Sequence, residues 1–447
     1  MIRTLIIAVT ATAFLAAAQK IPTPKLIQMA QKEPNSPAFR TAVTDALGRE
    51  AIQKGTAVAG ENGEFIWVTE AAKAPKLFLD DVAGPAMTQI QGTNLWFTTG
   101  KMRTGTSHTF HYIVDAKKVG GNENVPAYGP DSYEKPGVPK GKLSEKLVHT
   151  SKIYDGMQSN YWIYVPAQYD PKKPPALMVW QDGQGSVDRG GASRLQIVTD
   201  NLIHDRKIPV MIHVLIQPGT IGTIGGNKTS EYVQAFSKSS GRTLTDSMRS
   251  TEYDTVTDRY ARFLRDELLP EVYAKYNIRK DGYSRGIAGA SSGAIAAFNA
   301  AWFQPDQFSR VISRVGTYTS IQWQPGVLDG GNVYPNKVRK EPTRNIRVWL
   351  QDGSEDLENN HGSWPLQNIQ MANSLKMMDY DFHLSYGNGS HNGAHGNSEL
   401  PEELIWLWRD YDPAKSEQKY QMEPLEKAKP LFRVKIYNRD IETSEPR

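Results

Sequence analysis

Beyond residue 160 the sequence alternates between short apolar runs and longer amphipathic stretches, and this rhythm constrains the fold more than any other feature. The run VMIHVLI at 210–216 is continuously apolar, as expected of a strand covered on both faces, whereas residues 258–276 form an amphipathic helical pattern. Strands that alternate with helices predict a mostly parallel sheet with helices on both faces. Its functional residues are expected on the loops at the carboxyl ends of the strands. Further predicted strands of this sheet are YWIYVP (161–166), ALMVWQDG (176–183), RGIAGA (285–290), SRVISRVG (309–316), NIRVWLQDG (345–353) and YDFHLSYG (380–387).

The chain is long enough for two domains, because 447 residues exceed what a single core usually fills. Short alternating runs separated by turn residues predict a small antiparallel β-sandwich upstream of the sheet. The stretch that follows is dense in glycine, proline and charge, and is interpreted as a linker. We therefore predict a signal peptide at 1–18, an N-terminal extension at 19–60, the sandwich at 61–115, the linker at 116–142, the α/β domain at 143–412 and a charged C-terminal extension at 413–447.

The first residues indicate export. A basic Arg3, an apolar run over 5–17 and the small residues Ala16 and Ala18 are typical of a cleavable signal peptide. An uncleaved anchor is the alternative, although the apolar run is short for a membrane span. We expect a secreted or periplasmic protein with no stable membrane association after signal cleavage.

Charge and cysteine content narrow the chemistry. A formal net charge of +4 is small for this length, so no nucleic-acid partner is expected. The sequence has no cysteine, which excludes disulfides, thiolate catalysis and cysteine-ligated zinc.

The stretch GASSG at 289–293 matches the G-x-S-x-G pattern of a nucleophile elbow, with Ser291 at its centre. An apolar strand precedes it and an alanine-rich helix follows. In such an elbow the serine occupies a tight turn, and the glycines remove side chains that would clash there. The amino end of the helix supplies N–H groups and a positive dipole for a developing oxyanion. The alternatives are a structural turn with incidental serines and a dinucleotide-binding loop, whose glycine spacing is absent.

An elbow serine requires an acid and then a histidine further along the chain. Asp356 follows a predicted strand and suits the role, with Asp352, Glu355 and Glu358 as competitors and a solvated acidic loop as the alternative. His391 lies in a glycine-rich loop after the next predicted strand. Because it is nearer the strand end than His395, it is the predicted base.

The two histidines also have the spacing of helical metal ligands. Gly393 between them disfavours the helix that such a site needs. We therefore expect no metal site.

Four motifs in this order along the chain together resemble those of one family: WQDGQG at 180–185, GASSGA at 289–294, LQDGSEDL at 350–357 and GSHNGAHG at 389–396. They are similar to the esterase family that includes enterochelin esterases and the feruloyl and acetyl-xylan esterases of carbohydrate esterase family one. The resemblance covers roughly residues 145–411, and the upstream sandwich resembles the immunoglobulin-like domain of several members.

This resemblance implies an α/β-hydrolase fold and a serine esterase without a cofactor. It implies the triad Ser291, Asp356 and His391, and an oxyanion hole formed by the backbone N–H groups of Gly183 and Ser292.

The sequence does not determine which ester is the substrate. The leading expectation is a secreted hydrolase that removes feruloyl or acetyl groups from plant polysaccharide esters, with a carbohydrate-linked or aromatic substrate. A catecholate siderophore esterase of the enterochelin type and a non-catalytic carbohydrate-binding protein are the alternatives. Arg189, Arg194 and Arg249 are candidates to face an anionic substrate. The alternatives are a solvated face or structural ion pairs, such as Arg249 with Glu252 or Asp254. The candidate substrate-binding residues are Asp182, Gln184, Arg249, Glu252, Trp323, Trp364 and His395.

Overall fold

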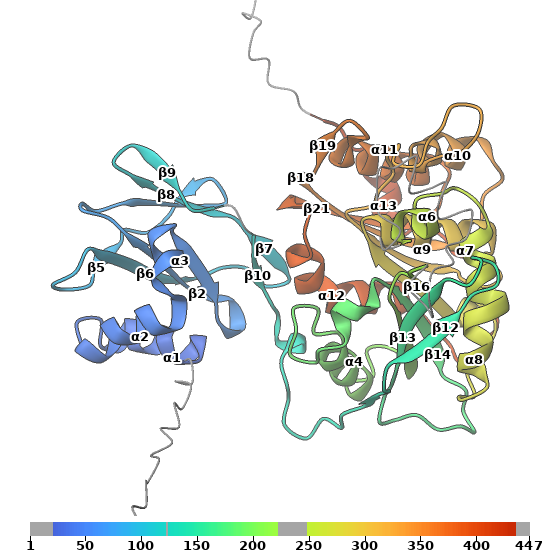
Figure 1. Ribbon diagram of the computed structural model, residues 1–447, viewed down its shortest axis with the longest axis horizontal. Coiled ribbons are helices and arrows are strands. Elements are labelled where there is room, and N and C mark those ends of the chain that lie inside the picture. The colour runs from blue at the N-terminus through green and yellow to red at the C-terminus, as the bar shows by residue number, and fades with distance from the viewer. Residues whose placement is uncertain (1–20, 122–123, 222–247, 435–447) are drawn as a thin grey trace, which may run out of the picture.

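A computed structural model describes residues 21–121, 124–221 and 248–434 (Figure 1). The predicted signal peptide at 1–18 lies outside the described residues. Two bodies of secondary structure lie side by side, a smaller N-terminal one and a larger C-terminal one (Figure 1). Within the described ranges, every helix is too short or too polar to cross a bilayer.

The N-terminal body is a β-sandwich with helices on one outer face. Its two sheets have the orders β1-β2-β6-β5 and β4-β3-β8-β9. Alternate residues of β2 (Glu64–Glu70) serve two cores: Phe65 and Trp67 pack toward the second sheet, whereas Ile66 and Val68 pack against the helices. The predicted small sandwich is thus confirmed. The other elements are α1 (Thr23–Lys32), α2 (Pro37–Leu47), α3 (Arg49–Gln53), β1 (Thr56–Ala59), β3 (Lys76–Leu79), β4 (Val82–Ala83), β5 (Thr88–Gln89), β6 (Leu95–Lys101), β8 (Phe110–Val114) and β9 (Lys117–Val119).

The structure corrects two predicted boundaries. Residues 19–60, predicted as an extension, carry α1 to α3 and β1, and their apolar side chains are buried against the first sheet. Residues 116–142, predicted as a linker, contain β9 and β10 (Val125–Ala127), and β10 pairs with β7 (Thr106–His108). Strands of three residues between glycine-rich turns leave no hydrophobic pattern long enough to detect.

The C-terminal body is built on a mostly parallel sheet, as predicted. Among the described residues the sheet has nine strands in the order β11-β13-β15-β14-β16-β17-β18-β21, with β12 paired to β13. Neighbours from β15 to β21 run parallel, and β13 is antiparallel to β15. The strands are β11 (Lys142–Leu143), β12 (Leu147–Thr150), β13 (Gln158–Val165), β14 (Ala176–Gln181), β15 (Met211–Ile216), β16 (Arg285–Ala290), β17 (Arg310–Arg314), β18 (Arg347–Glu355) and β21 (Asp381–Ser390).

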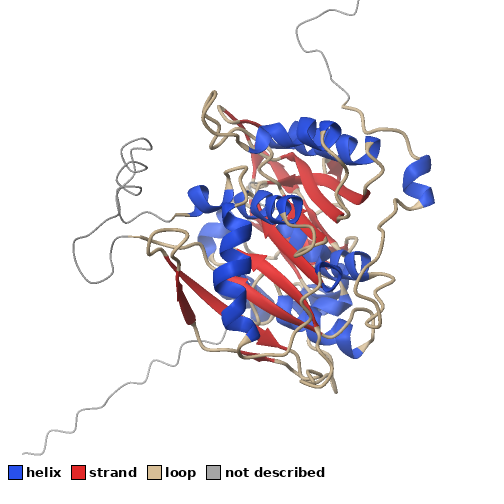
Figure 2. Ribbon diagram, turned by 90° about the vertical axis from the view of Figure 1, so that its right-hand side faces the viewer, coloured by secondary structure: helices blue, strands red, loops and turns tan. Residues whose placement is uncertain are grey.

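Helices cover both faces of this sheet (Figure 2). On β14, Leu177 and Val179 belong to one core, and Met178 and Trp180 belong to the other. This alternation explains why the strand reads as continuously apolar. The first core includes α7 (Arg259–Arg262), α8 (Leu269–Tyr273), α9 (Ser292–Phe303), α10 (Tyr334–Lys340) and α11 (Trp364–Met377), and the second includes α4 (Leu195–His204) and α12 (Ala394–Trp408).

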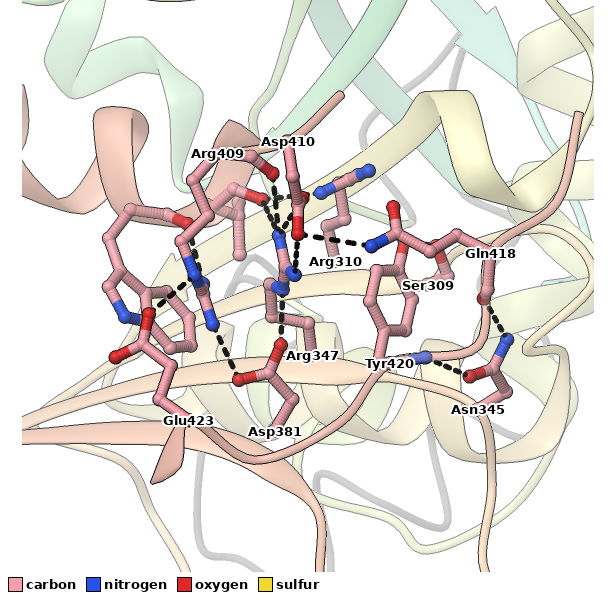
Figure 3. Close-up of polar contacts among 12 residues, drawn as sticks. Ser309, Arg310, Asn345, Arg347, Asp381, Arg409, Asp410, Gln418, Tyr420 and Glu423 are labelled. Carbon is pink, nitrogen blue, oxygen red and sulfur yellow. Dashed lines mark hydrogen bonds and ion pairs between the residues drawn. The ribbon is translucent and has the colours of Figure 1, made fainter. Parts of the chain in front are cut away.

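A buried arginine network lies at the amino ends of β17, β18 and β21 (Figure 3). Arg347 donates to Asp381 at 2.6 Å and to Asp410 at 3.1 Å. Arg409 donates to the other oxygen of Asp381 at 2.6 Å and pairs with Glu423 at 2.8 Å. The network therefore fastens the start of the predicted C-terminal extension to the sheet, on the edge away from the strand carboxyl ends.

The extension continues along the C-terminal body through α13 (Pro424–Ala428). The Phe432 N–H donates to the Asn373 side chain at 2.8 Å, which docks the last described residues on α11. Residues 435–447 lie outside the described residues.

Candidate active site

Ser291 stands between β16 and α9 in a strained backbone conformation, with φ 58° and ψ −124°. A Cβ added at Gly289 would lie 2.2 Å from the carbonyl oxygen of Gly293, so no larger residue fits there. This is the geometry of a nucleophile elbow, in which the turn presents the serine Oγ above the sheet.

The three residues of the predicted triad form one chain of contacts. His391 Nε2 lies 2.8 Å from Ser291 Oγ, and His391 Nδ1 lies 2.5 Å from Asp356 Oδ1. They follow or end the parallel strands β16, β18 and β21, so the carboxyl edge of the sheet brings them together.

A second layer of contacts surrounds Ser291 and His391. Thr317 Oγ1 lies 3.3 Å from Ser291 Oγ and accepts a hydrogen bond from Trp364 Nε1 at 3.2 Å. The Trp364 ring packs edge-on against the His391 ring, with 5.7 Å between centroids. Trp364 is only 2% exposed, so it supports the histidine and is not the predicted substrate platform. Sequence reasoning missed Thr317, whose only signal is its position just after β17.

Asp352 lies fully buried behind Asp356 and does not replace it. The Gly353 N–H donates to Asp352 Oδ1 at 2.8 Å, while Oδ2 of each carboxyl group is buried without an N–H or hydroxyl donor among the described residues. The two carboxyl groups interact closely enough to share a proton, and Asn368 also interacts with Asp352. Burial, and then the interaction with Asp356, raises the pKa of Asp352 well above its usual range.

The pKa of Asp356 shifts in the opposite direction to that of Asp352. Burial opposes its ionisation, but its hydrogen bonds with His391 and Asp352 outweigh burial and hold the pKa of Asp356 below its usual value. Near neutral pH, Asp352 therefore carries the shared proton and Asp356 the charge. The other predicted competitors, Glu355 and Glu358, are exposed.

The loop after β14 is tied to the elbow. Asp182 has a left-handed φ of 53° and precedes a short 3₁₀ turn, Gly183–Ser186. Arg249 grips both carboxylate oxygens of Asp182 at 2.7 Å and donates to the Ala290 carbonyl at 3.2 Å. The two predicted N–H donors, on Gly183 and Ser292, thus belong to segments that share one guanidinium.

This pairing corrects several expectations. Arg249 pairs with Asp182 rather than with Glu252 or Asp254, so the opposite charges of Asp182 and Arg249 already offset each other. Glu252 is 1% exposed, accepts from the Gly219 N–H at 2.7 Å, and has its pKa raised by burial to about 8. Its buried carboxyl is unavailable to substrate.

Arg189 and Arg194 have structural partners. Arg189 pairs with Glu134 at 2.6 Å and with Asp200 at 2.8 Å. The Arg194 guanidinium lies over the Tyr128 ring at 3.9 Å. Both arginines join the segment after β10 to the region of α4. Their guanidinium groups are therefore engaged in structural contacts within the protein.

His395 also departs from its predicted role. α12 begins at Ala394, where Asn392 Oδ1 accepts the Ala394 N–H at 2.9 Å, so Gly393 does not prevent a helix. His391 precedes this helix and His395 lies inside it. His395 is 6% exposed and lies 3.2 Å from Glu399, so it is a core contact.

Two predicted substrate contacts have exposed side chains. Gln184 is exposed in the loop after β14, and Trp323 is 48% exposed between β17 and α10. Residues 222–247, between β15 and the next described residues, lie outside the described residues.

Comparisons with known proteins identify the family. Residues 156–407 match the Esterase family model, described as "Putative esterase". An enterobactin esterase from Shigella flexneri, solved in the presence of enterobactin, is similar at 17% identity and a TM-score of 0.51 over 84% of this chain and 99% of that chain. An enterochelin esterase from Shigella flexneri is similar at 16% identity and a TM-score of 0.50 over 84% and 98%. A CE1 ferulic acid esterase from Anaeromyces mucronatus gives 15% identity and a TM-score of 0.44 over 62% and 93%.

At these identities the first two likenesses show the fold alone, and the third is too weak to support an argument. The family match covers more than half of the chain. The chain belongs to this esterase family and is a carboxylic ester hydrolase with the α/β-hydrolase fold.

Proposed function

We propose that the protein hydrolyses carboxylic esters through an acyl-enzyme formed on Ser291. The observation that carries this proposal is the unbroken chain of contacts from Ser291 Oγ through His391 to Asp356. No cofactor takes part in the proposed mechanism.

In the first half-reaction His391 Nε2 takes the Ser291 proton, and the serine oxygen attacks the ester carbonyl carbon. The Gly183 and Ser292 N–H groups donate to the tetrahedral oxyanion, each worth roughly 3 kcal/mol. Collapse breaks the bond to the alcohol, which leaves with the proton from His391. Asp356 holds the Nδ1–H tautomer and stabilises the imidazolium.

In the second half-reaction water attacks the acyl carbonyl, and His391 takes its proton. Collapse returns the proton to Ser291 and releases the carboxylic acid.

We infer that the substrate is an aromatic or carbohydrate-linked ester. Feruloyl and acetyl esters of plant polysaccharides are the leading candidates. The half-exposed Trp323 supports a ring-bearing substrate. A catecholate siderophore ester is the second candidate, supported by the likeness to enterobactin esterase across most of both chains. The engagement of Arg189, Arg194 and Arg249 by protein groups speaks against a strongly anionic ligand. We also propose export, on the basis of the N-terminal signal pattern.

Hydrolysis of p-nitrophenyl acetate tests the chemistry. Ser291→Ala should lose turnover by about three orders of magnitude or more, because it removes the nucleophile. Ser292→Ala keeps the backbone N–H and should remain active. An active Ser291→Ala and an inactive Ser292→Ala would show that the assignment is wrong.

A panel of methyl ferulate, acetylated xylan and a catecholate siderophore tests the substrate class. The highest kcat/KM should fall on the ferulate or the acetylated xylan. Preference for the siderophore would establish the second candidate.

A further inference from the structure

The loop that carries His391 is gripped from the N-terminal sandwich (α1 to β10). The residues on either side of His391 are Ser390 and Asn392, and both bond to one side chain of the sandwich, Asn124. Asn124 Oδ1 accepts the Ser390 N–H at 3.0 Å, the Ser390 hydroxyl at 2.8 Å and Asn392 Nδ2 at 3.1 Å. A single carbonyl oxygen thus bridges the two neighbours of the histidine.

A second grip lies two residues before Ser390. Asn388 Nδ2 donates to Asp80 Oδ1 at 3.2 Å and to Thr109 Oγ1 at 3.3 Å. Asp80 is itself fixed, because its Oδ2 lies 2.7 Å from His108 Nδ1 and its Oδ1 also accepts the Thr109 N–H at 2.9 Å. The second grip therefore acts through a sandwich carboxylate whose position is already fixed by its own neighbours.

The surrounding contacts place the sandwich against this part of the C-terminal body. The β7–β10 pair lies between the two bodies, next to α12 (Figure 1). A Cβ added at Gly105 would lie 2.8 Å from Glu402 of α12, which shows how close the two surfaces are.

The loop needs such support. β21 is the terminal strand in the order of the described sheet. It therefore has a neighbouring strand, β18, on one side only. The sequence GNGSHNG at 387–393 contains three glycines, which leave the backbone conformationally free. The pairing of β21 with β18 ends at Ser390, so beyond that residue the ring contacts of His391 with Ser291, Asp356 and Trp364 would otherwise have to order the segment.

We propose that the N-terminal sandwich positions the catalytic base, with Asn124 as a positioning residue that holds residues 388–392, where β21 ends and the next loop begins, so that His391 stays within reach of Ser291. This inference rests on the proposed function, since it assigns His391 the role of base. It differs from simple interdomain adhesion, because adhesion affects stability but not the rate of the chemical step.

Three full-length variants test the inference. Asn124→Leu keeps the approximate shape but removes the acceptor, and Asn124→Asp retains an acceptor oxygen. Asn94→Leu, at an exposed asparagine of the same sandwich, is the matched control. The readouts are kcat and KM for p-nitrophenyl acetate and the melting temperature of each variant.

Asn124→Leu should lower kcat by about tenfold or more with KM nearly unchanged, since hydrogen bonds that align the base are lost. Asn124→Asp should recover most of kcat, and Asn94→Leu should match the wild type. A loss of stability alone, with kcat retained in folded Asn124→Leu, overturns the inference.

If Asn124→Leu does not fold, Asn388→Ala removes the second grip from the other side and should lower kcat in the same direction. Full kcat in that variant also overturns the inference. Absence of ester hydrolysis in the wild type would instead refute the proposed function, so the two failures are distinguishable.

Discussion

Replacement of Asp352 should impair turnover, although this residue touches neither Ser291 nor His391 in the triad chain. Asp356 Oδ1 faces His391 Nδ1 and also accepts the Leu357 N–H, while its buried Oδ2 has no N–H or hydroxyl donor among the described residues, which leaves the carboxyl proton of Asp352 to serve it. Asp352→Ala removes that donor and leaves a charged oxygen unsatisfied. Hydrogen bonds to charged groups are worth about 1.5–3 kcal/mol, so kcat should fall roughly 10- to 100-fold.

Asp352→Asn separates the donor from the charge. The amide N–H can donate to Asp356 at every pH, so this variant should keep most of the turnover near pH 7. Because the pKa of Asp352 is raised, the wild-type residue is neutral at pH 7 and ionises only in the alkaline range, where two carboxylates then repel each other. Wild-type kcat should therefore decline at alkaline pH, and Asp352→Asn should decline less.

Steady-state kinetics of p-nitrophenyl acetate hydrolysis between pH 6 and pH 10, corrected for spontaneous hydrolysis, measures both effects. An Asp352→Ala variant with kcat within about twofold of the wild type would refute the reasoning. Equal, large losses in Asp352→Ala and Asp352→Asn would show that the donated proton is not the cause.

Three further perturbations follow from the same contacts. His391→Ala should reduce kcat about 1000-fold or more, while the buried His395→Ala should mainly lower the melting temperature; the reverse order of kcat would contradict the base assignment. The pKa of Glu252 rises on folding from 4.5 to about 8, so between these values the folded protein holds a proton that the unfolded chain has lost. As the pH rises through this range, the group should lower the free energy of unfolding by ~1.4 kcal/mol per pH unit. Urea titrations at several pH values should therefore show a shallower decline of this free energy for Glu252→Gln, and a decline equal to that of the wild type would refute the reasoning. Arg347→Met breaks the buried pair with Asp381 and should cost about 3–5 kcal/mol in the same titrations, whereas a loss below about 1 kcal/mol would show that Arg409 alone suffices.

Local patterns predicted much of the fold and the three residues, Ser291, His391 and Asp356, that form one chain of contacts. The strands of the central sheet are buried on both faces, so they stand out as apolar runs, and Gly289 of the elbow is required by a contact with Gly293, four residues away. Order along the chain then limited the choice of acid and base, which is why Asp356 and His391 are found where the pattern placed them.

Contacts between distant segments were not predictable in this way. Asn124 and Ser390 are 266 positions apart, and an asparagine in a glycine-rich stretch gives no sign of its partner. Residue type also does not reveal the direction of a side chain: Trp364 and His395 were expected at the substrate surface, but both point into packed surroundings. The proton on Asp352 depends on burial and on a neighbouring carboxylate, which only the folded chain provides.

Covalent labelling by an alkyl fluorophosphonate tests the central claim most directly, because such a reagent phosphonylates an activated serine. Mass spectrometry of the intact wild type should show one added phosphonyl group, and peptide mapping should place it on Ser291. Ser291→Ala should take up none, and Ser292→Ala should be labelled at Ser291. A label on another residue, or an enzyme that hydrolyses esters while remaining unlabelled, would contradict the proposed nucleophile.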